Sequence, residues 1–237
     1  MRYGSIIVTL LAFALLGATE WQHAQARMNR VDVHVDRPGD YVFLLEEEIA
    51  SDVQYFIGDT LGSSPAEINI ALLEEFIASH PAVAGTEVYL DFAGILHCKI
   101  RQRLPVLYVS GDAFKGYWDA SGHQFFGDEG NRGKCTELTH VSDSAMLLRT
   151  ISFVDAMQTD SIWLEGPPRL AFNAQDELEF QPHEALYKVV WGSPDLDSSR
   201  LARWYFFNRE ILPRTGSHHY KRINLKYKDQ IVALKNE

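Results

Sequence analysis

Few residues in this chain have the type and spacing that catalysis or metal binding needs. The two cysteines, Cys98 and Cys135, lie far apart and form no Cys-x-x-Cys pair. The nine histidines are scattered, and only His218 and His219 are adjacent. Neighbouring residues in an extended segment point to opposite sides, so this pair is a poor metal site. No zinc-protease, serine-hydrolase or phosphate-loop motif occurs in the sequence.

Two further clusters could do chemistry but have simpler explanations. Glu46–Glu48 places three carboxylates at the expected start of a helix, where they complement the helix dipole. No histidine or second acidic cluster is spaced to join them. Gly127, Gly130 and Gly133 do not follow a phosphate-loop pattern. We therefore predict no catalytic residue, no metal and no cofactor, and an active site assembled from distant residues stays open as an alternative.

Composition limits the possible partners. The chain has 237 residues, enough for one large or two small domains, and a formal net charge of -10. That charge argues against a nucleic-acid partner. From Arg200 onward, however, the sequence contains nine Lys and Arg residues but only three acidic residues, Glu210, Asp229 and Glu237. The C-terminal end is thus locally basic, either as a solvated surface or as a surface that faces a partner.

The stretch from Ile68 to Val109 predicts a helix followed by two strands. Asn69 stands where an N-cap belongs, and Pro81 prevents the helix from continuing. The apolar period then changes from that of a helix to two, with Gly94 at the turn. One apolar face of the ribbon should pack against the helix, through Leu72, Leu73, Phe76 and Ile77 on the helix and Val88, Leu90, Phe92, Leu96, Cys98 and Ile100 on the strands.

A strand and another helix precede this stretch. Val31–Asp36 alternates apolar and polar residues, and a helix is expected from Glu46 to Gly58. The resulting order is β-α-α-β-β. With the break at His80-Pro81 and the exit at Gln102–Pro105, it resembles a POTRA domain, and more narrowly that of the FtsQ/DivIB family of bacterial cell-division proteins. The resemblance implies an α+β fold with a POTRA domain at 31–103.

The remaining residues, 104–237, are expected to form a β-rich domain with two helices. A hairpin turn at Asp119–Gly122 is similar to one in the FtsQ/DivIB family. Helices are predicted from Ser142 to Met157 and from Asp197 to Ile211, the second stopped by Pro213 and Gly216. Short strands are expected at 162–164, 177–180 and 186–191 and at the C-terminal end. The ending INLKYKxQ resembles the Bacteroidetes branch of the family.

The N-terminal region, 1–21, contains an uncharged run between Arg2 and Glu20. As a helix, this run would span about 26 Å, the short end of a membrane crossing. The alternative is a cleaved signal peptide with a site at Ala24-Gln25-Ala26. The resemblance favours an uncleaved, single-pass anchor in the inner membrane with the bulk of the chain in the periplasm.

The resemblance implies a function as well as a fold. It suggests a non-enzymatic scaffold of the divisome that binds FtsB/DivIC and FtsL-type partners and regulates septal cell-wall synthesis, without a small-molecule substrate. The alternatives are an exported hydrolase or carbohydrate-binding protein, and a POTRA chaperone of outer-membrane or secretion machinery. In the resembled family a partner adds a strand at the end of the chain, which gives as expected contact residues Arg222, Ile223, Leu225, Lys226, Tyr227, Lys228, Gln230, Ile231, Val232 and Leu234. Lysines also protect edge strands against pairing, so a blocked edge is the competing interpretation.

Overall fold

A computed structural model describes residues 28–58, 68–160, 163 and 166–236. The chain divides into two compact units between Arg103 and Leu104. Both units combine helices with sheets, so the fold is α+β, as the sequence predicts.

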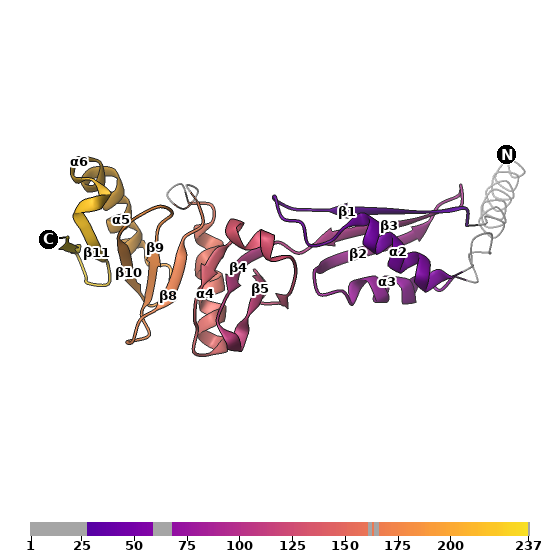
Figure 1. The fold of residues 1–237 in the computed structure, drawn as a ribbon, viewed down its shortest axis with the longest axis horizontal. Helices are drawn as coiled ribbons and strands as arrows, with labels where there is room; N and C mark the ends of the chain where they lie inside the picture. The colour runs from indigo at the N-terminus through magenta and orange to yellow at the C-terminus, as the bar shows by residue number, and fades with distance from the viewer. Residues whose placement is uncertain (1–27, 59–67, 161–162, 164–165, 237) are drawn as a thin grey trace, which may run out of the picture. The chain divides into compact units, whose positions relative to one another are not determined.

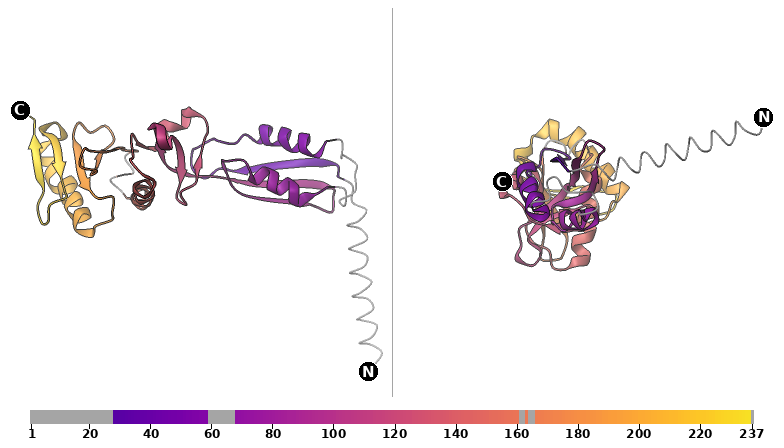
Figure 2. Two further views of the ribbon diagram at one scale, coloured as in Figure 1. Left: turned by 90° about the horizontal axis from the view of Figure 1, so that it is seen from below. Right: turned by 90° about the vertical axis from the view of Figure 1, so that its right-hand side faces the viewer.

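The first unit has the expected element order, β-α-α-β-β. Strand β1 runs parallel to β3, and β2 runs antiparallel to β3, so β3 is central in the order β1-β3-β2. Helix α2 packs on β1, α3 packs on β2, and the two helices touch each other, so both cover one face of the sheet (Figures 1 and 2). The bounds are β1 Arg30–Asp36, α2 Glu46–Ile57, α3 Ile70–Ala78, β2 Val83–Leu90 and β3 Ile95–Gln102.

Alternation along β3 fixes which face is buried. Leu96, Cys98 and Ile100 point under the helices and are buried, as predicted. The side chain of Asn69 accepts a hydrogen bond from the N–H of Leu72 and caps α3 as expected. The prediction for Leu72 itself was wrong, because its side chain is 51% exposed.

The buried stripe of α3 is narrower than the sequence pattern suggests. Only Leu73 and Ile77 are buried among the helical residues of α3. Phe76 is turned toward α2, where its ring stacks on Phe56 at 4.9 Å between centroids. Phe92 was expected in the core but is largely exposed just after β2. Helix α3 therefore packs on the sheet through Leu73 and Ile77, and Phe76 on its side contacts α2.

A buried glutamine ties the end of β3 to the loop before α2. Gln102 Oε1 accepts hydrogen bonds from the N–H groups of Phe43, at 2.7 Å, and Leu44, at 3.0 Å. Its amide nitrogen donates to the carbonyl of Tyr41 at 3.1 Å. Three backbone groups of the loop are thus satisfied by one side chain at the exit from the first unit.

The second unit contains a nine-stranded sheet among the described residues, in the order β12-β11-β10-β9-β8-β7-β4-β5-β6 (Figure 1). Neighbours are mixed, since β4–β7, β7–β8 and β10–β11 are parallel pairs. The bounds are β4 Pro105–Val109, β5 Gly116–Asp119, β6 Gln124–Phe125, β7 Thr136–Leu138, α4 Ser144–Met157, β8 Arg169–Phe172, β9 Leu178–Gln181, β10 Lys188–Gly192, α5 Ser198–Phe206, α6 Leu212–Thr215, β11 Tyr220–Asn224 and β12 Val232–Lys235.

Aromatic rings fill the core of this unit. Phe180 lies between Trp163, Trp191 and Trp204, with ring centroids 5.2, 6.3 and 5.4 Å away. All four are buried. Tyr220 of β11 joins the group through Phe207, as do further buried apolar side chains of β10 and β11.

The predicted end of the second helix needs correction. Pro213 does not stop this helix, because the chain passes through a π-helical segment, Phe207–Ile211, and continues as α6 to Thr215. Pro213 lies at the start of α6, directly after the π-helical turn. Gly216, the other predicted stop, ends the helix with a φ of 81°.

The strand predicted at 162–164 is not observed at Trp163, which lies in a turn; the other two positions are outside the described residues. Strands β7 and β8 were not predicted, because three or four residues carry too little alternation to be recognised. Within the described ranges, none of the helices has the length and apolar character that a membrane crossing requires. The predicted anchor lies outside those ranges.

Candidate functional site

The C-terminal hairpin forms one end of the large sheet. Strand β11 is paired on both sides, parallel to β10 and antiparallel to β12. Strand β12 has a neighbour on one side only among the described residues. Every residue of β12 is exposed, whereas Tyr220 and Ile223 of β11 are buried. The last strand thus offers an open backbone edge held in place by a packed neighbour.

The direction of the β12 amides follows from one hydrogen bond. Asn236 donates its N–H to the carbonyl of His219 at 2.9 Å, toward β11. Amides alternate in direction along an antiparallel strand, so those of Ala233 and Lys235 point away from β11. These are the groups that an added strand would meet.

The structure divides the ten predicted contact residues into three sets. Ile223 and Leu225 are completely buried, so their side chains belong to the core and cannot contact a partner directly. Tyr227, Val232 and Leu234 are between 43 and 55% exposed, at or beside the open edge. The others are the paired cations Arg222 and Lys226, together with Lys228, Gln230 and Ile231 in the β11–β12 connection.

Two of the predicted cations already have partners inside the unit. Lys226 Nζ lies 2.7 Å from Glu177, and Arg222 lies 2.5 Å from the nearly buried Glu179. Asn173 donates to both carboxylates, at 3.1 Å each. The hydrogen bond from Lys226, followed by that from Asn173, lowers the pKa of Glu177, and the same ion pair raises the pKa of Lys226.

This network corrects the electrostatic part of the sequence analysis. Arg222 and Lys226 form ion pairs that hold the end of the sheet together. If the basic C-terminal end attracts an acidic partner, other cations must therefore provide that attraction. Lys221, Lys228 and Lys235 make no ion pair within the described part of the chain. Of these, only Lys235 stands on β12, whose sequence is Val-Ala-Leu-Lys. An edge with one lysine at its end is less protected than the blocked-edge interpretation requires.

An apolar groove of about 410 Å³ lies beside this edge. Its walls come from α5, the π-helical segment and the connection that leads into β12. Phe206 is 56% exposed, and Ile211 and Ile231 are half-buried. Of these residues, only Ile231 was predicted as a contact from the sequence. Phe206 and Ile211 were missed, although both are apolar residues that lie off the helical stripe containing Trp204. The full lining is Ala202, Arg203, Phe206, Ile211, Asp229, Gln230 and Ile231.

The remaining candidates for chemistry have structural roles. Cys98 and Cys135 are both buried and form no disulfide with each other. Burial raises the pKa of the Cys98 thiol to about 11, which keeps it protonated and unreactive at neutral pH. In the described portion of the chain, no three His, Cys, Asp or Glu side chains are grouped so that they could hold a metal ion.

Comparison with known proteins identifies the family. Residues 104–234 match the family described as FtsQ/DivIB, C-terminal related. The chain belongs to the FtsQ/DivIB family. The match spans the second unit from its first strand into β12, so the sheet with the open edge is the part that carries membership. No curated protein matches the chain. Membership indicates a role in cell division, in a family of non-enzymatic division proteins.

Proposed function

We propose that this FtsQ/DivIB family member is a membrane-anchored, non-enzymatic scaffold of the divisome. Its β12 edge binds FtsB/DivIC and FtsL-type proteins in the periplasm and thereby helps to regulate septal cell-wall synthesis. The observation that carries the proposal is the last strand of the family-matched unit. It is exposed along its length and, among the residues that the structure describes, paired on one side only.

Strand addition fits the geometry of this edge. A partner strand would accept hydrogen bonds from the outward amides of Ala233 and Lys235, and its alternate side chains would lie beside Val232 and Leu234. The connection before β12 brings the apolar groove to the end of such a strand. A large apolar side chain of the partner, placed in the groove against Phe206 and Ile211, would give selectivity that backbone pairing alone lacks.

Two further parts of the proposal rest on the first unit and the N-terminal region. We propose that residues 31–103 form a POTRA domain, which the observed order β1-α2-α3-β2-β3 supports. We also propose that the uncharged run before Glu20 is the anchor; N-terminal sequencing of the purified protein that begins at Arg27 would contradict it.

A proline substitution tests the edge. Ala233→Pro removes one outward N–H without removing a donor to β11, so the hairpin should persist while strand addition fails. Ala233→Ser is the matched control, because it keeps the N–H. We expect co-purification of the division partners to be lost with the proline and retained with the serine.

The groove is tested by Phe206→Asp, which places a charge in its apolar wall, with Leu186→Asp as a control at an exposed apolar residue away from the groove. Partner binding should weaken in the first variant and not in the second. If both Ala233→Pro and Phe206→Asp leave co-purification unchanged in a folded protein, the β12 edge is not the docking surface. Detection of glycan binding or hydrolysis by the cleaved protein would favour the alternative of an exported hydrolase or carbohydrate-binding protein.

A further inference from the structure

The sheet of the first unit has two outer strands, and they differ in how their edges are protected. On β1, Glu46 Oε1 accepts the N–H of Val35 at 3.0 Å, so a side chain from the start of α2 occupies that edge. Charged residues also alternate along β1. On β2, the backbone of residues 84–90 is hydrogen-bonded only to β3 within the described ranges. The β2 edge is therefore the open one.

The outward amides of β2 can be assigned. Asp91 donates its N–H to the carbonyl of Ile95 at 3.0 Å, toward β3. By alternation along the antiparallel strand, the amides of Val88 and Thr86 point away from β3. An extended segment placed beside β2 would meet two free donors spaced as in a sheet ladder.

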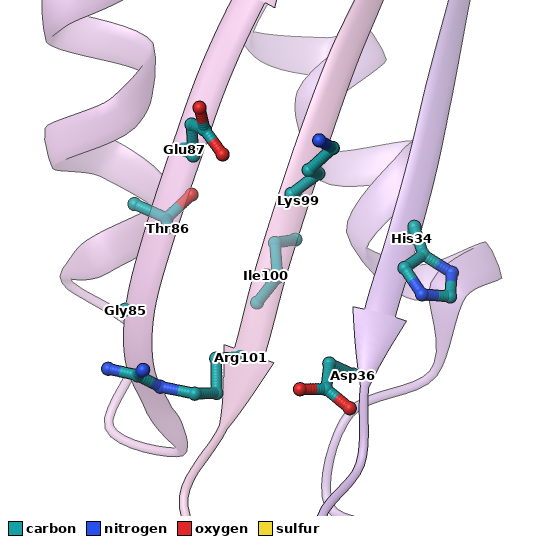
Figure 3. A pocket seen from close by; sticks show the side chains of 8 residues that line it. All are labelled: His34, Asp36, Gly85, Thr86, Glu87, Lys99, Ile100 and Arg101. Carbon is teal, nitrogen blue, oxygen red and sulfur yellow. The ribbon is translucent and has the colours of Figure 1, made fainter.

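A cation from the central strand reaches over this edge. Arg101 stands opposite Gly85 in the β2–β3 register. Its guanidinium extends across β2, away from Asp36 and toward the glycine (Figure 3). A Cβ added at Gly85 would lie 3.2 Å from a guanidinium nitrogen. Because Gly85 has no side chain, the Arg101 side chain has room to lie across β2 at this position.

Arg101 is the uncompensated charge of this surface. It makes no hydrogen bond or ion pair with a described residue. The groove around it, about 460 Å³, also contains Lys99, Glu87, His34 and Asp36. Lys99 lies over the ring of Tyr89 and opposite Glu87, and His34 lies 3.7 Å from Glu46. Asp36 of β1 stands opposite Arg101 in the β1–β3 register, but the guanidinium extends away from it, toward the open edge (Figure 3).

A second copy of the chain does not fit this edge. Helix α3 packs on β2, so pairing of two β2 strands would bring two α3 helices side by side. Paired strands are about 4.8 Å apart, whereas packed helices need about 8 to 10 Å. The occupant must be a single extended segment without a helix in that layer.

We propose that the open edge of β2 is a second docking site, which binds an extended segment of a partner protein with an acidic side chain opposite Gly85. The segment adds to the sheet through the amides of Thr86 and Val88. Its acidic side chain lies beside the Arg101 guanidinium, which makes no ion pair with a carboxylate of the described residues. This site lies in the first unit and does not depend on strand addition at β12.

Dye-labelled heptapeptides test the proposal on the full chain. One alternates valine with threonine and has aspartate at its centre; the other has lysine there. By fluorescence anisotropy, the aspartate peptide should bind about five- to tenfold more tightly. Arg101→Glu should reverse this order, whereas Arg30→Glu, an equal charge change on β1, should preserve it. Hydrogen exchange of residues 84–90 should slow when the aspartate peptide is bound.

Three results would overturn the inference. They are equal binding of both peptides or none at millimolar concentration, an unchanged preference in a folded Arg101→Glu protein, and exchange protection outside β2. Because the peptides do not involve β12, loss of the β12 interaction in Ala233→Pro would leave these expectations unchanged. Failure here would likewise leave the proposed divisome role intact.

Discussion

The two units fill their cores with different side chains. In the first unit the buried apolar residues are aliphatic or sulfur-containing, and no aromatic ring is buried among its described residues. In the second, Trp163, Phe180, Trp191, Trp204 and Phe207 form a continuous set of ring contacts. A small sheet covered by two short helices is filled by branched aliphatic chains, whereas a wide sheet leaves a deeper space that large rings fill.

This difference matters for the open edges. Strand β12 is bonded to β11, and β11 is packed through Tyr220 and Ile223 into the aromatic core. Strand β2 is held by Val88 and Leu90 against an aliphatic core and by α3. The β12 edge is thus supported through its buried neighbour β11, whereas β2 contributes buried side chains of its own. Large aromatic rings bury more area per residue and lose less side-chain entropy than several aliphatic residues of equal volume.

The largest expected effect is at the centre of the aromatic core. Phe180→Ala should lower the free energy of unfolding of the second unit by about 3 to 5 kcal/mol, because it removes contacts to three tryptophans. Hydrogen exchange by mass spectrometry should show faster exchange in β9–β11 and unchanged exchange in β3. The exposed Phe126→Ala is the control. Equal acceleration in both units would contradict the separation of the two cores.

A smaller or similar effect is expected in the aliphatic core. Leu73→Ala should destabilise the first unit by about 2 to 5 kcal/mol, since Leu73 is completely buried. Leu72→Ala, its exposed neighbour, should change stability by less than about 0.5 kcal/mol. Denaturant melts of the two variants measure the difference. A larger loss in Leu72→Ala would mean that α3 packs through the face predicted from the sequence.

The smallest effect concerns the ion pair behind the β12 edge. The folded-state pKa of Glu177 lies below its ordinary value of 4.5 because Lys226 and Asn173 donate to it. A depressed pKa gives stability that is present above the ordinary value and lost as the pH falls through the folded value. The raised pKa of Lys226 acts in the opposite sense, and its contribution is lost only as the pH rises above about 10.5.

The melting temperature should therefore fall less between about pH 7 and pH 3 in Lys226→Gln than in the unmodified protein. Lys228→Gln, which removes a lysine without an ion pair, should behave like the unmodified protein. Identical acid sensitivity in all three proteins would show that the Lys226–Glu177 pair does not contribute to stability.

Much of the fold could be predicted because its signals are local. The caps Asn69, Asp143 and Asp197 act on amides two or three residues away, and each caps a helix in the structure. Alternation along β3 assigned its buried face correctly. Short strands such as β7 and β8 escaped, because pairing with neighbours, and not their own pattern, makes them extended.

The candidate site was predictable only in part. The basic, alternating end of the chain indicated strands within Ile223–Leu234. The structure places β11 and β12 at the two ends of that stretch, with an irregular connection between them. The same pattern gave Ile223 and Leu225 as contacts, since alternation cannot distinguish a core strand from an edge strand. The groove beside α5 forms where a π-helical segment and a loop come together. It could not be predicted, because neither segment has a local sequence signature.

The sequence by itself determined the order of elements in the first unit, most of the helix starts and the inward face of β3, because each depends on residues within a few positions. Only the tertiary structure decided which strands are edges and which cations are free. Lys226 pairs with Glu177 and Arg222 with Glu179 across strands distant in sequence, while Arg101 makes no ion pair with a described residue. Such pairings follow from strand order and register, which are set by the packing of the whole sheet and not by any one segment.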